Sequence, residues 1–468
     1  MNFKTISVYA LGMGGSACLS LVTFPVLAWF YSPEDIGRIS MLQVICSLVV
    51  LFFSLGLDQA YVREFNETND KARLTKTIFW PGFILLITTL GVLTPFFKEI
   101  TSFLFDEQEL YIFLLFSCAL VFLYLERYFS VFLRMKEYAS AYSLTKVVSK
   151  ALFLTLICIV YFDRELARFS YLAMIQVISW FATILVMIFF LKDEISWIIS
   201  SRVEKNKLLP LLQFSYPLVL SSAAFWGLSS LDRLMLKSYA SFAELGVYSI
   251  AVSLAGTAAL VQQFFSILWL PTIYKWVSKG VELDKVQKIA SMTQLLSFVL
   301  IPLVGLLSWI VALFLPENYQ YLHFILAACM IGPLFMMVSE VTGIGISIVR
   351  KTKYLSFVSG FSLIVNAFLN YFLIPNYGAR GAATATAISF YIFLLLKTEV
   401  SSRIWRSVPR LRMYACSTIM VFISACFALF GQDHMVMFFY IWAGSILLML
   451  FLYRDCFNGI NINFSRYF

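Results

Sequence analysis

Long apolar segments recur along the whole chain, and short polar stretches separate them. Segments of about 18 or more apolar residues are long enough for a helix to cross a hydrocarbon core of about 30 Å. The short alternating segments of membrane β-strands do not appear. The pattern predicts an all-α, polytopic membrane protein with fourteen transmembrane helices, at residues 6–30, 37–61, 78–104, 110–133, 138–162, 168–191, 212–237, 246–270, 291–315, 320–347, 354–375, 380–398, 413–430 and 435–453.

Composition agrees with this pattern. The chain is 61% hydrophobic and 13% charged, whereas soluble domains carry about 25% charged residues. The basic start is followed by an apolar stretch too long for a signal peptide, so we expect a retained first span. The eight cysteines lie singly, without metal-ligand spacing, and are expected to pack as small apolar residues.

The distribution of charge predicts an orientation. When the loops are assigned alternately to two sides, most of the 35 Lys and Arg residues fall on one side. The positive-inside rule makes that side cytoplasmic and places both termini there. The net charge of +9 therefore reflects topology and attraction to anionic headgroups, and no nucleic-acid partner is needed.

Short similarities predict an internal repeat. Gly37, at the junction of the first and second predicted spans, and Gly246, at the junction of the seventh and eighth, are 209 residues apart. The pairs Tyr161-Phe162 and Ile178-Ser179 recur 210 residues later. A single period with the same starting side predicts two six-helix lobes in parallel repeat, plus two extra C-terminal helices. The expected division is an N-terminal lobe, a cytoplasmic linker with surface-helix character, a C-terminal lobe, and two added helices with a tail, at residues 1–191, 192–211, 212–398 and 399–468.

Several motifs carry a family resemblance. Asp35-x-Gly37 and the run Gly56 to Ala60 resemble the MOP superfamily of transporters. The segments 232–251, 270–275 and 374–389 are similar to its polysaccharide-transport branch, the Wzx-type flippases. The resemblance covers nearly the whole chain.

This resemblance implies a bacterial inner-membrane protein. Such a protein moves a polyprenyl-pyrophosphate-linked oligosaccharide, such as an O-antigen unit of lipopolysaccharide, from the cytoplasmic to the periplasmic leaflet. Besides this substrate and the membrane lipids, a polysaccharide polymerase and a chain-length regulator are the partners it suggests.

Cations inside the apolar segments give the main hypothesis for a site. A charge within a span costs roughly 2.5 to 3.5 kcal/mol on insertion scales, so it usually faces a partner or a wet cavity. Arg127, Ser130 and Arg134 share one face of the fourth predicted helix, and Lys146 and Lys150 share one face of the fifth. If these faces meet, their donors replace the hydration of a pyrophosphate. Arg127, Lys146 and Lys150 are therefore the predicted substrate-binding residues.

The same cations have a structural alternative. They could snorkel to the cytoplasmic interface or pair with Glu126 and Glu137. Arg134 and Lys136 lie close to the turn and fit snorkelling better. Lys150 lies roughly 18 Å along its helix from the turn, which is too deep to snorkel easily.

Five other charged residues are predicted to act in gating or ion coupling. Asp232, Arg233 and Lys237 fall near the periplasmic end of the seventh helix, as an outer gate, a proton-coupled carboxylate or a charged cap. Glu340 is the deepest carboxylate of the second half and either carries protons or pairs with a cation. Asp58 is expected to cap or gate the cytoplasmic side.

The remaining polar signals favour transport over catalysis. Asn366 and Asn370 share a helix face and either contact the glycan or, as we favour, link helices by hydrogen bonds. His323 and His434 have no acidic cluster around them for a metal site or a triad. A phosphate-binding GxxxxGK[ST] loop is absent. We therefore expect no catalytic residues, metal or cofactor.

The leading hypothesis is a flippase that works by alternating access between two lobes. A lipid II flippase and a multidrug or cation exporter of the same superfamily are alternatives, although a cation exporter is expected to present acids to its substrate. A membrane glycosyltransferase, polymerase or acyltransferase normally needs a large loop or a clustered acid/base set. No such feature occurs in the sequence, so we do not expect an enzyme.

Overall fold

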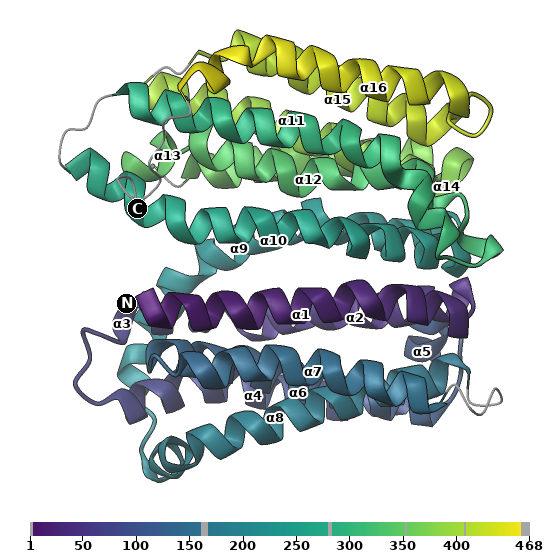
Figure 1. Cartoon of the computed structure of the whole chain (residues 1–468). Helices are drawn as coiled ribbons and strands as arrows, with labels where there is room; N and C mark the ends of the chain where they lie inside the picture. Colours follow the sequence, from purple (N-terminus) through teal and green to yellow (C-terminus); the bar gives the residue numbers. More distant parts are fainter. Residues whose placement is uncertain (1–2, 161–166, 279–282, 352, 407–408, 460–468) are drawn as a thin grey trace. The chain divides into compact units, whose positions relative to one another are not determined.

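The computed structural model describes residues 3–160, 167–278, 283–351, 353–406 and 409–459, and every element in these ranges is helical (Figure 1). Tyr161 and Phe162 of the predicted repeat lie outside them. The α-helices are α1 (Phe3–Phe30), α2 (Pro33–Phe53), α3 (Leu57–Glu64), α4 (Lys71–Leu93), α5 (Phe97–Phe105), α6 (Leu110–Met135), α7 (Ala139–Val160), α8 (Phe169–Ser200), α9 (Lys205–Tyr239), α10 (Phe242–Ser278), α11 (Leu283–Leu313), α12 (Leu322–Thr342), α13 (Gly345–Ile348), α14 (Lys353–Ile404), α15 (Leu411–Phe430) and α16 (Met435–Leu452). Short 3-10 helices are η1 (Thr94–Phe96), η3 (Glu317–Tyr319) and η4 (Arg454–Gly459).

Thirteen continuous segments in the described ranges are long and apolar enough to cross a membrane. One of them, α14, has 52 residues and would measure about 78 Å if straight, far more than a bilayer core of about 30 Å. Its backbone breaks at Gly378, where φ is 52° and ψ is −130°. The side chains of Asn366 and Thr386, 20 residues apart, form a hydrogen bond of 3.3 Å, so α14 folds back on itself. The described ranges therefore contain fourteen potential spans when the two halves of α14 are counted separately, and the prediction of an all-α polytopic membrane protein is confirmed.

The second predicted span is interrupted near its end. Helix α2 stops at Phe53, and Leu55 and Gly56 both adopt left-handed backbone conformations before α3 begins. A Cβ on Gly56 would lie 2.7 Å from Val219 Cγ2 of α9, so glycine is required both for its positive φ and for this close approach. The break redirects the chain at the residue that precedes α3 and thereby sets the position of Asp58.

The chain forms two compact units, Met1–Trp226 and Gly227–Phe468. In the first unit α8 packs against α6 and α7, and α1 packs against α7. In the second unit α12 is central, because it contacts α10, α11, α14 and α15. Residues 192–200 continue α8, and α9 begins at Lys205. The predicted division at residues 192–211 stays a prediction, and in the sequence the boundary between the two compact units falls between Trp226 and Gly227 of α9.

Helix boundaries recur at the spacing the sequence predicts. Helix α2 begins at Pro33, and its counterpart α10 begins at Phe242. Helix α8 begins at Phe169, and its counterpart, the second half of α14, begins at Ala379. A contact recurs with them: Asp35 Oδ1 accepts a hydrogen bond from Phe169 N at 3.1 Å, and Glu244 Oε2 accepts one from Ala379 N at 2.7 Å. The two carboxylates are 209 residues apart and the two amides 210. The same local design thus occurs once in each unit.

Candidate functional site

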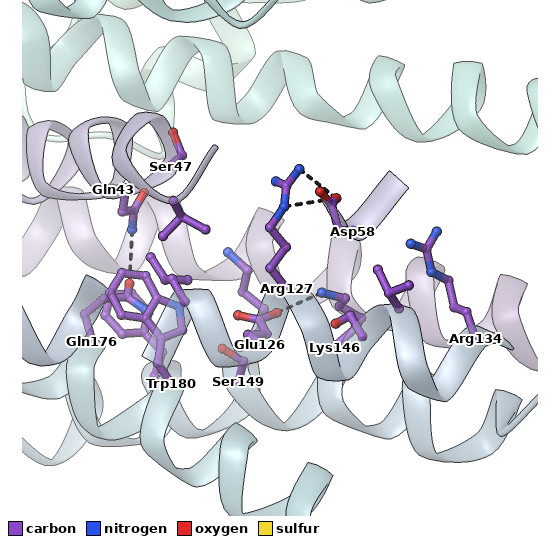
Figure 2. Close-up of a pocket in the computed structure, with 16 residues that line it drawn as sticks. Gln43, Ser47, Asp58, Glu126, Arg127, Arg134, Lys146, Ser149, Gln176 and Trp180 are labelled. Carbon is purple, nitrogen blue, oxygen red and sulfur yellow. Dashed lines mark hydrogen bonds and ion pairs between the residues drawn. The ribbon is translucent and has the colours of Figure 1, made fainter. Parts of the chain in front are cut away.

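A cavity of about 610 Å³ lies inside the first unit, among five of its helices (Figure 2). Its lining carries four cations against two carboxylates. The residues come from α2 (Gln43, Ser47, Val50), α3 (Asp58), α6 (Leu123, Glu126, Arg127, Ser130, Val131, Arg134), α7 (Lys146, Ser149, Lys150, Phe153) and α8 (Gln176, Trp180).

Arg127 is held by Asp58 across the cavity wall. Its Nη2 and Nε lie 2.8 Å and 3.1 Å from the same oxygen, Asp58 Oδ2. The other oxygen, Oδ1, is buried and has no hydrogen-bond partner within the described ranges. Asp58 is 7% exposed, so the turn at Leu55 and Gly56 delivers a nearly buried carboxylate to this cation. The sequence predicted a cap or gate at Asp58 and did not predict its pairing with Arg127.

Lys146 has a carboxylate partner as well. Its Nζ lies 2.9 Å from Glu126 Oε1 and 5.5 Å from the centre of the Tyr142 ring. Pairing with Glu126 is one of the alternatives that the sequence left open. Both partners remain partly exposed, with 33% and 20% of their side chains accessible, so the pair faces the cavity.

Lys150 lines the same cavity without an ion pair in the described part of the chain. Lys150 lies one turn after Lys146 on α7, so its ammonium group adds a second positive charge to the side of the cavity formed by α7. Arg134, for which the sequence favours snorkelling to the cytoplasmic interface, also lines the cavity and is exposed. The structure therefore brings together Arg127, Lys146 and Lys150, and adds a fourth cation.

Neutral polar groups occupy another part of the lining. Gln43 Nε2 of α2 donates a hydrogen bond of 3.0 Å to Gln176 Oε1 of α8, and Trp180 lies one turn further along α8. Ser47 Oγ accepts a hydrogen bond of 2.9 Å from Trp226 Nε1. The sequence analysis missed these residues. A glutamine inside an apolar span was the available signal for Gln43 and Gln176.

In the second unit Asp232 is the centre of a buried polar network. It is 2% exposed, and its Oδ2 accepts hydrogen bonds from Tyr248 and, at 3.1 Å, from Thr386. Arg233 Nε is buried without a partner among the described residues. Lys237 Nζ lies 5.8 Å from the Phe242 ring. Asp232 thus lies inside the helix bundle, more deeply buried than the predicted interfacial cap.

Asn366 and Asn370 extend this network. Asn370 Nδ2 donates to Asn366 Oδ1 at 2.9 Å, and Asn366 Nδ2 donates to Thr386 at 3.3 Å. Both asparagines have no exposed surface. Their contacts link the two halves of α14, as in the helix-linking alternative.

Glu340 belongs to a separate polar cluster. Its two carboxylate oxygens accept hydrogen bonds from Gln262 and Ser266 of α10. Lys397 Nζ donates a hydrogen bond of 3.1 Å to Oγ of Ser339, the residue that precedes Glu340 in the chain. This arrangement places a carboxylate and an ammonium close together without a direct ion pair in the described ranges.

The described part of the chain contains no group of three or more His, Cys, Asp or Glu side chains that could hold a metal ion. The two histidines are distant in the sequence, and His323 contacts Gln320 O and the Phe324 ring. The polar sites are therefore built from cations, carboxylates and amides inside membrane-spanning helices.

The long apolar helices define a multi-pass membrane protein that has a polar cavity inside its first unit. Residues 3–277 match the family described as "Polysaccharide biosynthesis protein", and the chain belongs to this family.

Two curated relatives match most of the chain. The capsular polysaccharide biosynthesis protein CapF of Staphylococcus aureus is 25% identical over 399 residues, which cover 81% of this chain and 94% of the relative. The Lsg locus putative protein 1 of Haemophilus influenzae is 23% identical over 413 residues, covering 83% and 97%.

Solved structures of transporters share the fold. The inward closed conformation of the lipid II flippase MurJ matches with a TM-score of 0.71 at 14% identity, over 96% of this chain and 99% of that one. An inward-facing MATE family transporter of the MOP superfamily matches with a TM-score of 0.57 at 15% identity, over 86% and 96%. The chain therefore shares its fold with these two proteins.

Proposed function

We propose that this protein is a flippase for a polyprenyl-pyrophosphate-linked oligosaccharide. It works by alternating access in the bacterial inner membrane, moves its substrate from the cytoplasmic to the periplasmic leaflet, and has both termini in the cytoplasm. The observation that carries the proposal is a cavity within membrane-spanning helices that presents Arg127, Arg134, Lys146 and Lys150 against only Asp58 and Glu126. The family description and the name of the relative CapF, a capsular polysaccharide biosynthesis protein, support a role in surface polysaccharide synthesis.

The ion pairs explain how such a cavity is tolerated when it is empty. An unpaired cation inside a span is costly, and Asp58 and Glu126 neutralise Arg127 and Lys146. A pyrophosphate competes with these carboxylates and is attracted first by Lys150, which has no ion pair in the described ranges. Release then restores the two internal pairs, so binding stays weak enough for transport.

The sign of the cavity separates this proposal from its alternatives. A multidrug or cation exporter is expected to present carboxylates to its substrate, and here the lining has a surplus of two positive charges. A lipid II flippase carries the same pyrophosphate chemistry, so it remains a close alternative, distinguished by its glycan. The polymerase and the chain-length regulator stay proposed partners.

A reconstituted assay tests the proposal. Proteoliposomes containing the full chain receive an isoprenyl pyrophosphate that carries a fluorescently labelled oligosaccharide, and a membrane-impermeant quencher reports the fraction in the outer leaflet. We expect the protein to accelerate exchange of this probe and to leave a labelled phosphatidylethanolamine unmoved. No acceleration, or equal movement of both lipids, would contradict the proposal.

A further inference from the structure

The cavity of the first unit has two chemically different ends. In Figure 2 Gln43, Gln176 and Trp180 lie together at one end and Arg134 lies at the other, with Arg127 and its partner between them. The cationic end takes an anion. The neutral end carries amides and an aromatic ring, and the proposed pyrophosphate gives it no role.

The amides at the neutral end are only half used. Gln43 Nε2 donates to Gln176 Oε1 at 3.0 Å, which leaves Gln43 Oε1 as a free acceptor and Gln176 Nε2 as a free donor. Neither atom has a hydrogen-bond partner in the described part of the chain. One bond is enough to join α2 to α8, so a purely structural contact leaves the second acceptor and donor unexplained.

Trp180 adds a third unused group. Its side chain is 8% exposed and lines the cavity, and its indole N–H has no partner among the described residues. Trp180 follows Gln176 by four residues on α8, so both side chains lie on the same helix face. An apolar ring face, an indole donor and a free amide therefore lie next to each other.

We infer that this end of the cavity is a subsite for a sugar ring of the lipid-linked glycan. A pyranose has an apolar face that packs on an aromatic ring. Its hydroxyl or acetamido groups act as both donors and acceptors, and match the free Gln43 Oε1 and Gln176 Nε2. The inference rests on the proposed function, and it adds that the protein recognises the sugar as well as the pyrophosphate.

The order of the two ends along the helices fits this substrate. Arg134 lies one residue before the end of α6 at the predicted cytoplasmic turn, and Arg127 lies about 10 Å further in. Gln176 lies seven residues after Phe169, the first residue of α8, at the end of that helix away from the predicted cytoplasmic side. A pyrophosphate on the cations therefore directs the attached sugar deeper into the bundle, toward Gln176 and Trp180.

Two probes separate the sugar contact from the anion contact. One is a fluorescent isoprenyl pyrophosphate that carries a single hexose, and the other is the same isoprenyl pyrophosphate without sugar. Binding of both to the purified full chain is measured for Trp180→Ala, Gln43→Leu, Lys150→Ala and the control Trp309→Leu, a tryptophan on α11 that is 41% exposed.

Trp180→Ala is expected to weaken binding of the hexose probe by roughly tenfold, the loss of an aromatic contact, and to leave the sugar-free probe within about twofold. Gln43→Leu is also expected to weaken binding of the hexose probe more than binding of the sugar-free probe. Because Gln43 is an exposed residue of α2, this variant keeps the test open if Trp180→Ala does not fold. Trp309→Leu is expected to change neither affinity.

Equal weakening of both probes, or of neither, in both Trp180→Ala and Gln43→Leu would overturn the sugar subsite. A separate result would contradict the proposed function itself. In that case Lys150→Ala would bind both pyrophosphate probes with the same affinity as the unaltered chain.

Discussion

The guanidinium group of Arg127 holds one oxygen of Asp58 through two donors, Nη2 at 2.8 Å and Nε at 3.1 Å. Asp58 and Arg127 are 69 residues apart in the chain. Their side chains are 10% and 29% exposed, so the pair is shielded from bulk water more than a surface ion pair. Both residues line the cavity that we propose for the substrate, so changes to this pair are expected to affect both folding stability and substrate binding.

A double-mutant cycle on Arg127→Ala and Asp58→Ala should show strong coupling. Each single variant leaves the other charge poorly solvated and without its partner. The double variant removes both charges, so it leaves no unpaired charge. We expect a coupling free energy of about 1 to 3 kcal/mol, measured by thermal unfolding in detergent.

The matched control is the pair of Arg73 and Asp70, at 2.9 Å with side chains 52% and 47% exposed. Asp70 also caps α4 through Arg73 N, and the cycle removes that contribution from the coupling energy. The control coupling should stay below about 1 kcal/mol. Equal coupling in both pairs would show that burial adds nothing at Arg127.

Removing cations from the cavity should stop transport. The double variant Arg127→Ala with Lys150→Ala loses a bidentate donor and the cation that has no ion pair, so we expect at least about a tenfold loss of flipping rate. The measurements are the reconstituted flipping rate and surface glycan display at equal protein level. Lys98→Ala, an exposed lysine of α5 outside the cavity, serves as the control. Normal display by the double variant would remove the cations from the mechanism.

Gly56→Ala should destabilise the first unit and slow transport. The left-handed conformation costs a non-glycine residue about 1 to 2 kcal/mol, and the added Cβ would lie 2.7 Å from Val219 and 3.1 Å from Ser215 O. We expect lower thermal stability and a lower flipping rate, because the turn positions Asp58.

The comparison for this variant is Gly91→Ala on α4, where a Cβ meets nothing within 4 Å. An alanine in an open helical position should stabilise by about 0.5 to 1 kcal/mol. If Gly56→Ala were as stable as Gly91→Ala, the close packing at this turn would not matter.

Glu244→Ala should loosen the break in α14. Glu244 Oε2 accepts the Ala379 amide, and Oε1 accepts the Tyr321 hydroxyl at 3.0 Å. Burial, and then the nearby Glu244 carboxylate, raise the pKa of Tyr321, so this hydroxyl stays protonated and able to donate. Ala379 is fully buried, and loss of its acceptor should cost about 1 to 3 kcal/mol in unfolding free energy.

Glu244→Gln keeps an acceptor and should retain most of the stability, whereas Glu317→Ala, an exposed site in the same unit, should have little effect. Asp35→Ala should reproduce the loss in the first unit, because Asp35 makes the equivalent contact. Unchanged melting of both Ala variants would refute a structural role for the repeated carboxylate.

Glu340→Gln tests ion coupling. A proton-carrying carboxylate must change its charge during transport, and a glutamine at this position has no charge to change. We expect slower flipping and a weaker dependence on external pH in proteoliposomes, with Glu317→Gln as the control. Full transport by Glu340→Gln at every external pH would exclude a proton-carrying role.

The helices were largely predictable because each of their signals is local. Apolar length predicted the spans from α1 to α16, and the acidic turns at Asp35 and Glu244 fall where the repeat predicts them. The same holds within α14, where the sequence predicts separate spans at 354–375 and 380–398. The backbone breaks between them at Gly378, and the contact of Asn366 with Thr386 agrees with a reversal of direction there.

The cavity residues were predictable only where their helix face was visible. Arg127, Lys146 and Lys150 followed from helical spacing on two neighbouring segments, i, i+3, i+7 for Arg127 and i, i+4 for the two lysines. Gln43, Gln176 and Trp180, in contrast, lie on helices far apart in the chain. Helix periodicity cannot tell which distant face lies opposite a given residue.

The sequence by itself determined the membrane-spanning helices, the repeat at 209 to 210 residues, and the cations that lie inside spans, because hydrophobic length and helical periodicity act within one segment. Only the tertiary structure decided that Asp58 neutralises Arg127, that Glu126 rather than Glu137 neutralises Lys146, and that Lys150 lacks an ion pair in the described ranges. It also joined Gln43 to Gln176. These pairings depend on which helices pack together and on a single left-handed turn at Gly56, since the electrostatic cost of each cation is set by neighbours that lie far away in the chain.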